Sequence, residues 1–409
     1  MTQEPSGRSQ PSDVDYHLLI PFLTHVVLTQ TLILIIRVTT SYRVLELGLP
    51  VLWLGFIATG FAIVPAFSAL QVGRWIDRGN DARAVWLGSS LVLVACVSLW
   101  AWPLSGLHLV GLSVLLGFGH MFCMAGHQTL AVRAGGARGR EATLGYYMVA
   151  ASIGQGLGPF TVGWLGGAAA VPPTATLFAV GLATAALGFA VAVLIRPVRK
   201  QAGRGGSGTF IPITELLKIR GFVAVMVSSV VTITAQDLLV IYLPALGAER
   251  SIQSDHIGYM LTVRSLASLV SRAFYARLIF TVGRVPLTLS SMLASAAAFA
   301  VLALPLPLPA MYAVLVFLGF AMGIASTLTI SSVVHLAPVE ACGTALTLRM
   351  TGNRVGQIVF PAAAGVLAAA SGVGGILLSV GFGLAASGTA VAMRQPSRRS
   401  QHSLPADKA

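Results

Sequence analysis

Twelve apolar stretches follow one another along this chain, and each is long enough to cross a lipid bilayer. About 20 apolar residues span the hydrocarbon core as an α-helix, and a helix satisfies its own backbone hydrogen bonds there. The stretches are 18–42, 50–72, 84–103, 107–131, 143–167, 174–196, 221–245, 256–276, 286–305, 309–334, 342–370 and 374–394. The sequence therefore predicts an all-α membrane protein with twelve transmembrane helices.

The positive charges are distributed unevenly between the two sides of the predicted membrane. The net charge is +13, although only 10% of the residues are charged, against about 25% in a soluble domain. If the N-terminus is cytoplasmic, 20 of the 26 Lys and Arg residues lie on the cytoplasmic side, and two lie in outer loops. Because basic residues concentrate on the cytoplasmic side, we expect both termini there, in a multi-pass protein of a bacterial-type cytoplasmic (inner) membrane. This distribution accounts for most of the net charge, so no nucleic-acid partner is expected.

A polar stretch at the middle of the chain divides the spans into two groups of six. Residues 197–220 are rich in Gly, Ser and basic residues, a composition typical of a linker. We expect a cytoplasmic tail at 1–17, a first six-helix bundle at 18–196, a cytoplasmic linker at 197–220, a second six-helix bundle at 221–394 and a cytoplasmic tail at 395–409.

The two halves carry an internal sequence repeat. Residues 54–75 align without gaps with 257–278, which matches Gly55 with Gly258. Residues 154–163 align with 356–365 at nearly the same offset and share Gly-Gln, Pro and Gly. Duplicated membrane halves enclose a substrate site near the midplane and alternate its exposure, so this six-plus-six repeat indicates a transporter.

The twelve spans, the repeat and the loop after the second span resemble the major facilitator superfamily of transporters. That loop is similar to the family's G-x-x-x-D-R-x-G-x-R-R motif, with the later glycine displaced by one position. The matching residues are Gly73, Asp77, Arg78 and Arg83, and the degenerate second-half copy keeps Gly283 and Arg284. The resemblance implies a conformational switch, in which Asp77 forms a latch with the other bundle in one conformation. A solvated loop of mixed charges is the alternative.

A second motif lies in the fifth span. It matches a G-x8-G-x3-G-P-x2-G-G pattern, apart from Val162 at the penultimate glycine, through Gly145, Gly154, Gly158, Pro159 and Gly163. Small residues four apart let another helix approach closely, and the proline bends its helix. The pattern resembles the signature of proton-coupled antiporters and so implies export, whereas ordinary helix packing is the alternative.

Asp237 is the only acidic residue deep within a predicted span. An ionisable group at mid-membrane costs about 2.5 to 3.5 kcal/mol on insertion scales and usually marks a pathway or a pair. By depth along their spans, Arg264 and Arg354 are the expected partners. Two interpretations stay open: Asp237 carries the coupling proton, or it belongs to a permanent ion pair within the second bundle.

Four arginines inside the spans give the interior an excess of positive charge. With the polar side chains near them, the expected cavity residues are Arg37, Gln30, Arg264, Arg349, Asn353, Arg354, His120 and His127. A guanidinium offers a planar fork for carboxylates, which favours an anionic cargo; alternatively, Arg37 and Arg264 extend to the water interface. The two histidines share a helix face without further ligands, so we expect no metal site.

The sequence contains no zinc-hydrolase, serine-hydrolase or nucleotide-binding motif. We therefore expect neither an enzyme nor a cofactor. We expect a secondary transporter that moves a small organic molecule across the bilayer by alternating access, as a proton-coupled exporter. Following the resemblance, we expect a monomer. An uptake carrier for an organic anion or a vitamin-like nutrient is the alternative.

Overall fold

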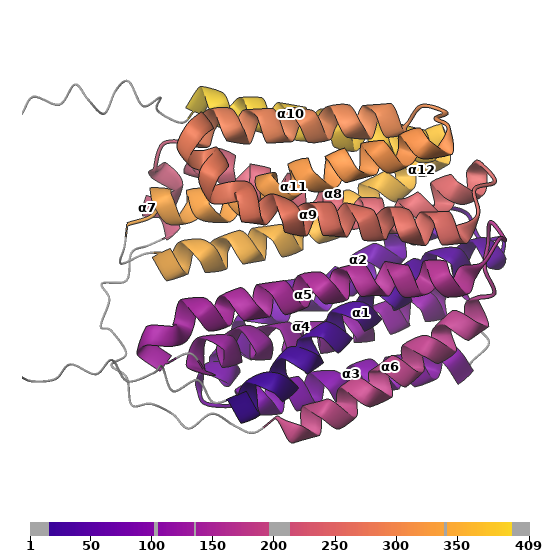
Figure 1. Ribbon diagram of the computed structural model, residues 1–409, viewed down its shortest axis with the longest axis horizontal. Helices are drawn as coiled ribbons and strands as arrows, with labels where there is room; N and C mark the ends of the chain where they lie inside the picture. Colours follow the sequence, from indigo (N-terminus) through magenta and orange to yellow (C-terminus); the bar gives the residue numbers. More distant parts are fainter. Residues whose placement is uncertain (1–15, 102–104, 135, 196–212, 339–341, 395–409) are drawn as a thin grey trace, which may run out of the picture.

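The long helices of this protein run side by side in two bundles (Figure 1). The computed structural model describes residues 16–101, 105–134, 136–195, 213–338 and 342–394. The first bundle contains α1 (Tyr16–Glu46), α2 (Leu52–Asp77), α3 (Asp81–Ala101), α4 (Gly106–Ala134), α5 (Gly136–Gly166) and α6 (Thr174–Leu194). After the short α7 (Ile213–Lys218), the second contains α8 (Phe222–Glu249), α9 (Ser254–Val282), α10 (Arg284–Leu302), α11 (Leu308–Leu336) and α12 (Cys342–Arg394). The prediction of an all-α fold is confirmed.

The segment α12 consists of two helices joined at a break. At Gly372 the backbone has φ 66° and ψ −175°, a conformation that glycine adopts far more readily than other residues. The break lies between the predicted spans 342–370 and 374–394, so the described residues contain twelve long helical segments where the sequence predicts them.

Most of these segments have the length and apolarity of membrane spans. Ten helices of the described residues meet both conditions. The other two segments are α5 and the part of α12 before Gly372, which carry polar side chains such as Gln155 and Arg349.

The predicted linker 197–220 is partly helical. The helix α7 buries Leu216, and its Glu215 and Lys218 side chains pair at 2.7 Å. Residues 197–212 and most of the two predicted tails (1–15 and 395–409) lie outside the described residues, so those boundaries stay predictions.

The packing of the helices defines the two bundles and their interface. In the first bundle α1 packs against α5 and α6, and α2 and α3 pack against α4. In the second, α8 packs against α12 and α11, and α9 packs against α11. Between the bundles, α5 contacts α9, α2 contacts α12, and α1 contacts α8. We call the end of the bundles that carries α7, at the left of Figure 1, the linker end, and the opposite end the far end.

Glycines that the sequence repeat relates bring the bundles together at the far end. Gly163 of α5 lies against Gly258 of α9, and Gly55 of α2 lies against Gly365 of α12. A Cβ atom on Gly55 would come within 2.5 Å of the Pro361 carbonyl oxygen, so this approach requires glycine. Because the repeat matches Gly55 with Gly258 and Gly163 with Gly365, the two halves make the same contact twice.

The hydrogen bonds between the two bundles lie at the far end and around the middle of the helices. At the far end the Ser254 backbone N–H donates to the Ala169 carbonyl at 2.9 Å. The described inter-bundle bond nearest the linker end runs from Arg272 Nη1 to Ser152 Oγ at 3.0 Å. In the described part of the chain, the bundles are therefore joined from the far end to about the middle of the helices.

Candidate functional site

An ion pair between the two bundles lies at the centre of the candidate site. Arg37 Nη1 of α1 donates to Asp237 Oδ1 of α8 at 2.8 Å, and the side chains are 14% and 19% exposed. The Arg37 guanidinium also lies over the ring of Phe61, 5.1 Å from its centroid, a favourable cation–π geometry. The pair therefore ties α1 to α8 across the bundle interface.

Asp237 has a second partner within its own bundle. Gln357 Nε2 of α12 donates to Asp237 Oδ2 at 2.5 Å, and Arg354 Nη1 donates to Gln357 Oε1 at 3.0 Å. The expected direct pairing of Asp237 with Arg264 or Arg354 is therefore wrong. The reason is that depth along a span does not determine which face of the helix a residue occupies, nor which bundle it meets.

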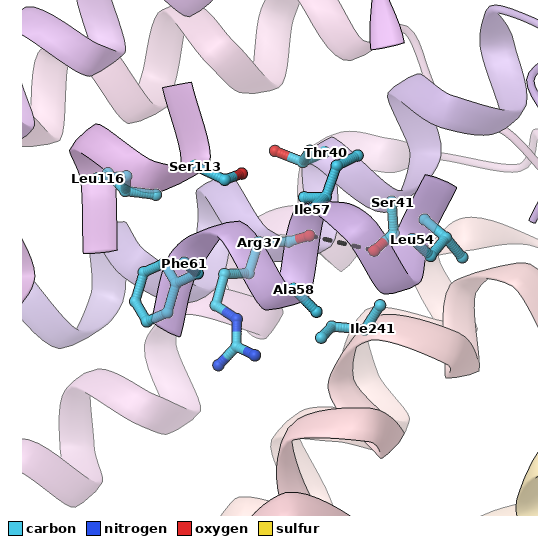
Figure 2. A pocket seen from close by; sticks show the side chains of 10 residues that line it. All are labelled: Arg37, Thr40, Ser41, Leu54, Ile57, Ala58, Phe61, Ser113, Leu116 and Ile241. Atoms are coloured by element: carbon cyan, nitrogen blue, oxygen red, sulfur yellow. Dashed lines mark hydrogen bonds between the residues drawn. The ribbon is translucent and has the colours of Figure 1, made fainter. Parts of the chain in front are cut away.

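A small pocket lies next to Arg37, on its far-end side. Its walls come from α1, α2, α4 and α8, and Figure 2 shows Arg37 beside Phe61 among Thr40, Ser41, Leu54, Ile57, Ala58, Ser113, Leu116 and Ile241. Thr40 and Ser41 donate their hydroxyls to carbonyls of their own helix. Most of the other lining residues are apolar, so the ion pair lies at the edge of a largely apolar pocket, where charges interact more strongly than in bulk water.

Two further predicted cavity arginines are buried in the second bundle. Arg264 is 7% exposed, and its Nη2 donates to Ser265 Oγ at 3.3 Å. Arg349 is also 7% exposed, and its Nη2 lies 3.5 Å from Thr329 Oγ1. Asn353 Oδ1 accepts from Ser229 Oγ at 3.0 Å. These side chains are held inside the bundle and do not extend to a helix end.

The predicted His127 belongs to a hydrogen-bonded group inside the first bundle. His127 Nε2 lies 2.7 Å from His25 Nδ1, and His25 Nε2 lies 2.8 Å from Ser89 Oγ. The Ser89 hydroxyl donates to the Val85 carbonyl at 2.7 Å, so it accepts from His25 and leaves His25 Nδ1 to accept from His127. No sequence pattern indicates this pairing, because His25 and His127 are 102 residues apart.

The other polar residues predicted for the first bundle lie in different surroundings. Neither ring nitrogen of His120 has a hydrogen-bond partner in the described part of the chain, and the ring lies 5.6 Å from that of Phe61. Gln30 Nε2 donates to Met124 Sδ at 2.9 Å. His120 is therefore near the Arg37 site, and Gln30 packs within the bundle.

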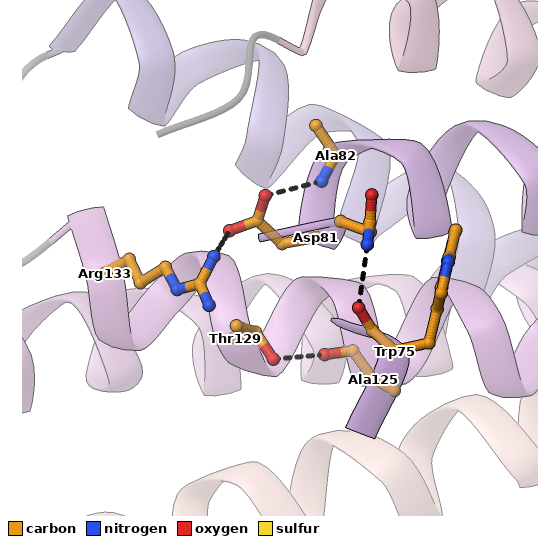
Figure 3. Close-up of polar contacts among 7 residues, drawn as sticks. Trp75, Asp81, Ala82, Ala125, Thr129 and Arg133 are labelled. Carbon is orange, nitrogen blue, oxygen red and sulfur yellow. Dashed lines mark hydrogen bonds and ion pairs between the residues drawn. The ribbon is translucent and has the colours of Figure 1, made fainter. Parts of the chain in front are cut away.

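A buried acid, Asp81, follows the predicted switch loop at a position that the loop motif does not mark. Asp81, at the start of α3, is fully buried; its Oδ2 pairs with Arg133 Nη1 of α4 at 2.6 Å and its Oδ1 accepts from the Ala82 N–H at 2.8 Å (Figure 3). Asn80 Nδ2 donates to the Trp75 carbonyl at 2.9 Å. These bonds fix the turn between α2 and α3 against α4.

The structure describes most residues of the loop motif. Gly73 lies near the end of α2, Arg78 is its exposed C-cap, and Arg83 bonds to Asn80 at 3.1 Å. The side chain of Asp77 lies outside the described residues. In the second half, Gly283 separates α9 from α10 with φ 89°, and Arg284 donates to Ser331 of α11 at 2.7 Å.

The glycines of the fifth-span motif contact two different helices. Gly154 and Gly158 lie against α1, near Val27 and Thr31, and Gly163 lies against α9. Pro159 is inside α5, and no atom of the described residues lies within 4 Å of the place where a Cβ atom on Gly145 would stand. The motif therefore brings α5 close to helices of both bundles.

The described residues contain no group of three or more His, Cys, Asp or Glu side chains arranged to hold a metal ion. The site is composed of arginines, one carboxylate, amides and aromatic rings. Arginines and amides can bind and orient a polar molecule, and a carboxylate can take up or release a proton.

Comparison with protein families identifies the class. The family model of the Major Facilitator Superfamily matches residues 20–249 and 225–409. The chain therefore belongs to this superfamily and is a multi-pass membrane protein, a secondary transporter of small molecules. No curated protein sequence matches it.

Solved structures show the same fold at low sequence identity. A bacterial homologue of the human lysosomal transporter Spinster, in an inward-facing and unoccupied conformation, has a TM-score of 0.74 at 12% identity, covering 94% of this chain and 96% of the other. A D-xylose–proton symporter has a TM-score of 0.76 at 12% identity, covering 94% and 98%. A nucleoside transporter has a TM-score of 0.74 at 13% identity, covering 92% and 98%.

Proposed function

We propose that this transporter exports a small organic molecule in exchange for protons, and that Asp237 carries the proton. The observation that supports this most strongly is the ion pair at 2.8 Å between Arg37 of one bundle and Asp237 of the other. A titratable group that joins the two moving parts of a transporter links proton binding directly to their relative motion.

Protonation of Asp237 would release the bundles from each other. The neutral acid loses its Coulomb attraction to Arg37, which is strong where water is excluded. Arg37 is then free to bind cargo or to move with its bundle. Deprotonation restores the pair and favours the conformation in which α1 and α8 are tied together.

The orientation follows from the distribution of basic residues. We place the linker end and both termini in the cytoplasm of a bacterial-type inner membrane, by the positive-inside rule. With that orientation, the glycine contacts of α5 with α9 and of α2 with α12 close the outer side. The described conformation is then the one that receives cargo from the cytoplasm. The loop with Asp77 remains our proposed switch, and we propose a monomer.

The charge balance of the interior supports an anionic cargo. Arg37, Arg264, Arg349 and Arg354 face one acid among the described residues deep in the spans, Asp237, and Arg37 already neutralises it. A membrane interior with uncompensated guanidinium groups favours an anion there.

The proposed direction, export, is based on the resemblance of the fifth-span motif to the motif of proton-coupled antiporters. The glycines of this motif bring α5 close to α1 and α9, which also suits a transporter working in the other direction. Uptake of an organic anion or a vitamin-like nutrient is the second candidate, and a proton symporter with the same fold supports it.

Metabolite profiling tests both the cargo and the direction. We expect one compound to accumulate inside cells that lack the gene and to rise in the medium of cells that overproduce the protein. A compound that disappears from the medium only when the protein is made would contradict export and establish uptake.

A further inference from the structure

A buried guanidinium that has no acidic partner among the described residues lies in the second bundle, apart from the Arg37–Asp237 pair. Arg349 is 7% exposed. Its one hydrogen bond to a described residue, to Thr329 Oγ1, is 3.5 Å long, the weak limit of such bonds. Its Nε atom is buried without a partner in the described part of the chain. Most of its N–H donors therefore have no acceptor among the described residues.

Arg349 is also isolated from the charges of the central site. Asp237 pairs with Arg37, whereas none of the ion pairs among the described residues includes Arg349. A buried charge without a partner lowers the stability of the fold. A bound anion would compensate the charge of Arg349, since no described acid does so.

Asn353 provides a second donor next to Arg349. The two residues are four apart on α12 and so lie on one helix face. The Ser229 hydroxyl donates to Asn353 Oδ1 at 3.0 Å, which leaves the amide NH₂ group to donate elsewhere. The Thr329 hydroxyl already donates to the Ser326 carbonyl at 2.8 Å. The cluster is rich in donors and has no acid, which is the composition of an anion site.

The position of this cluster suits entry from the linker end. Ser229, Thr329 and Arg349 each lie seven residues from the linker-side end of their helix, about 10 Å at 1.5 Å per residue. By the offset of the internal repeat, the first-half equivalent of Arg349 is Tyr147, which is buried and neutral. The packing at this depth therefore does not itself require a positive charge.

We propose that Arg349 and Asn353 bind a carboxylate or similar oxyanion of the cargo when it enters from the linker side. The inference rests on the proposed transport function and specifies the cargo's chemistry. A guanidinium pairs with an oxyanion through two parallel N–H donors, and the Asn353 amide adds a third. A free inorganic anion shares this chemistry, and the rate of export by Asn353→Asp distinguishes the cargo from a free anion.

The first test measures anion binding by the purified full-length protein in detergent. We expect acetate or inorganic phosphate to raise the midpoint of thermal unfolding by about 2 °C or more over chloride at equal ionic strength. Arg349→Met should lose this shift without a lower midpoint in anion-poor buffer, because it removes an unpaired charge. Arg277→Met, at an exposed position of α9, is the matched control and should keep the shift.

A second variant supplies the missing acid within the chain. Asn353→Asp places a carboxylate one helical turn from Arg349, where it also accepts from Ser229. We expect a higher midpoint without added anion, loss of the response to acetate and phosphate, and about a tenfold or greater fall in export of the compound found by profiling.

Three results would overturn the inference. The first is that neither anion raises the unfolding midpoint of the wild type and that Asn353→Asp does not have a higher midpoint than the wild type. The second is an unchanged response in Arg349→Met, which would place the anion elsewhere. The third is wild-type export by Asn353→Asp, which would assign the site to a free anion instead of the cargo. The proposal that transport is coupled to protons is tested separately, by the pH dependence of transport in the Asp237→Asn variant. It can therefore fail without affecting the anion site.

Discussion

Replacing Gly258 by leucine is expected to hold the far end of the two bundles open and to suppress transport. The backbone of Gly163 and the Pro159 carbonyl lie against Gly258, and a Cβ atom there would come within 2.6 Å of that carbonyl oxygen. Overpacking costs about 1–3 kcal/mol, enough to shift a two-state equilibrium about 5- to 150-fold. The protein should therefore favour the conformation that is open at the far end.

The shift is measured as a distance across the far end. Spin labels at the exposed positions Ala168 and Gln253 should lie farther apart in Gly258→Leu than in the wild type, and transport should fall by a similar factor. Gly111→Leu is the matched control, since a Cβ atom on Gly111 meets nothing within 4 Å. Unchanged label distances together with wild-type transport would contradict this role of the glycine contact.

Asp237→Asn is expected to abolish the pH dependence of transport and to lower its rate about tenfold or more, since a shift of 1.4 kcal/mol gives a factor of ten. The variant keeps an oxygen that accepts from Gln357 but has no charge for Arg37 and no proton to release. A buried charge that loses its partner costs about 3–5 kcal/mol, so insertion and folding must be measured beside transport.

The measurement is the rate of cargo transport in vesicles across a range of pH. Glu215→Gln, which removes an exposed acid of α7, should retain the wild-type profile. A normal pH profile in folded Asp237→Asn would exclude Asp237 as the proton carrier.

The course of the helices was predictable because membrane crossing constrains length and apolarity so strongly. The break at Gly372 falls in the interval that the sequence left between its last two spans. The sequence repeat matches Gly55 with Gly258, and the structure places each of them against a glycine of the other bundle.

The partners of buried polar groups were not predictable, because they depend on how helices distant in the sequence face each other. Asp237 meets Arg37, 200 residues away in the other bundle, and Asp81 meets Arg133 across 52 residues. Hydropathy and charge mark such residues as costly in a membrane, but only the three-dimensional packing assigns their contacts.

Proton-coupled export through Asp237 is tested directly by counting protons during transport in sealed vesicles. Vesicles with purified protein and a pH-sensitive dye are given a gradient of the compound identified by profiling. We expect proton movement opposite to the cargo in the wild type and none in Asp237→Asn. Loss of the cargo gradient without proton movement in the wild type would contradict proton-coupled export.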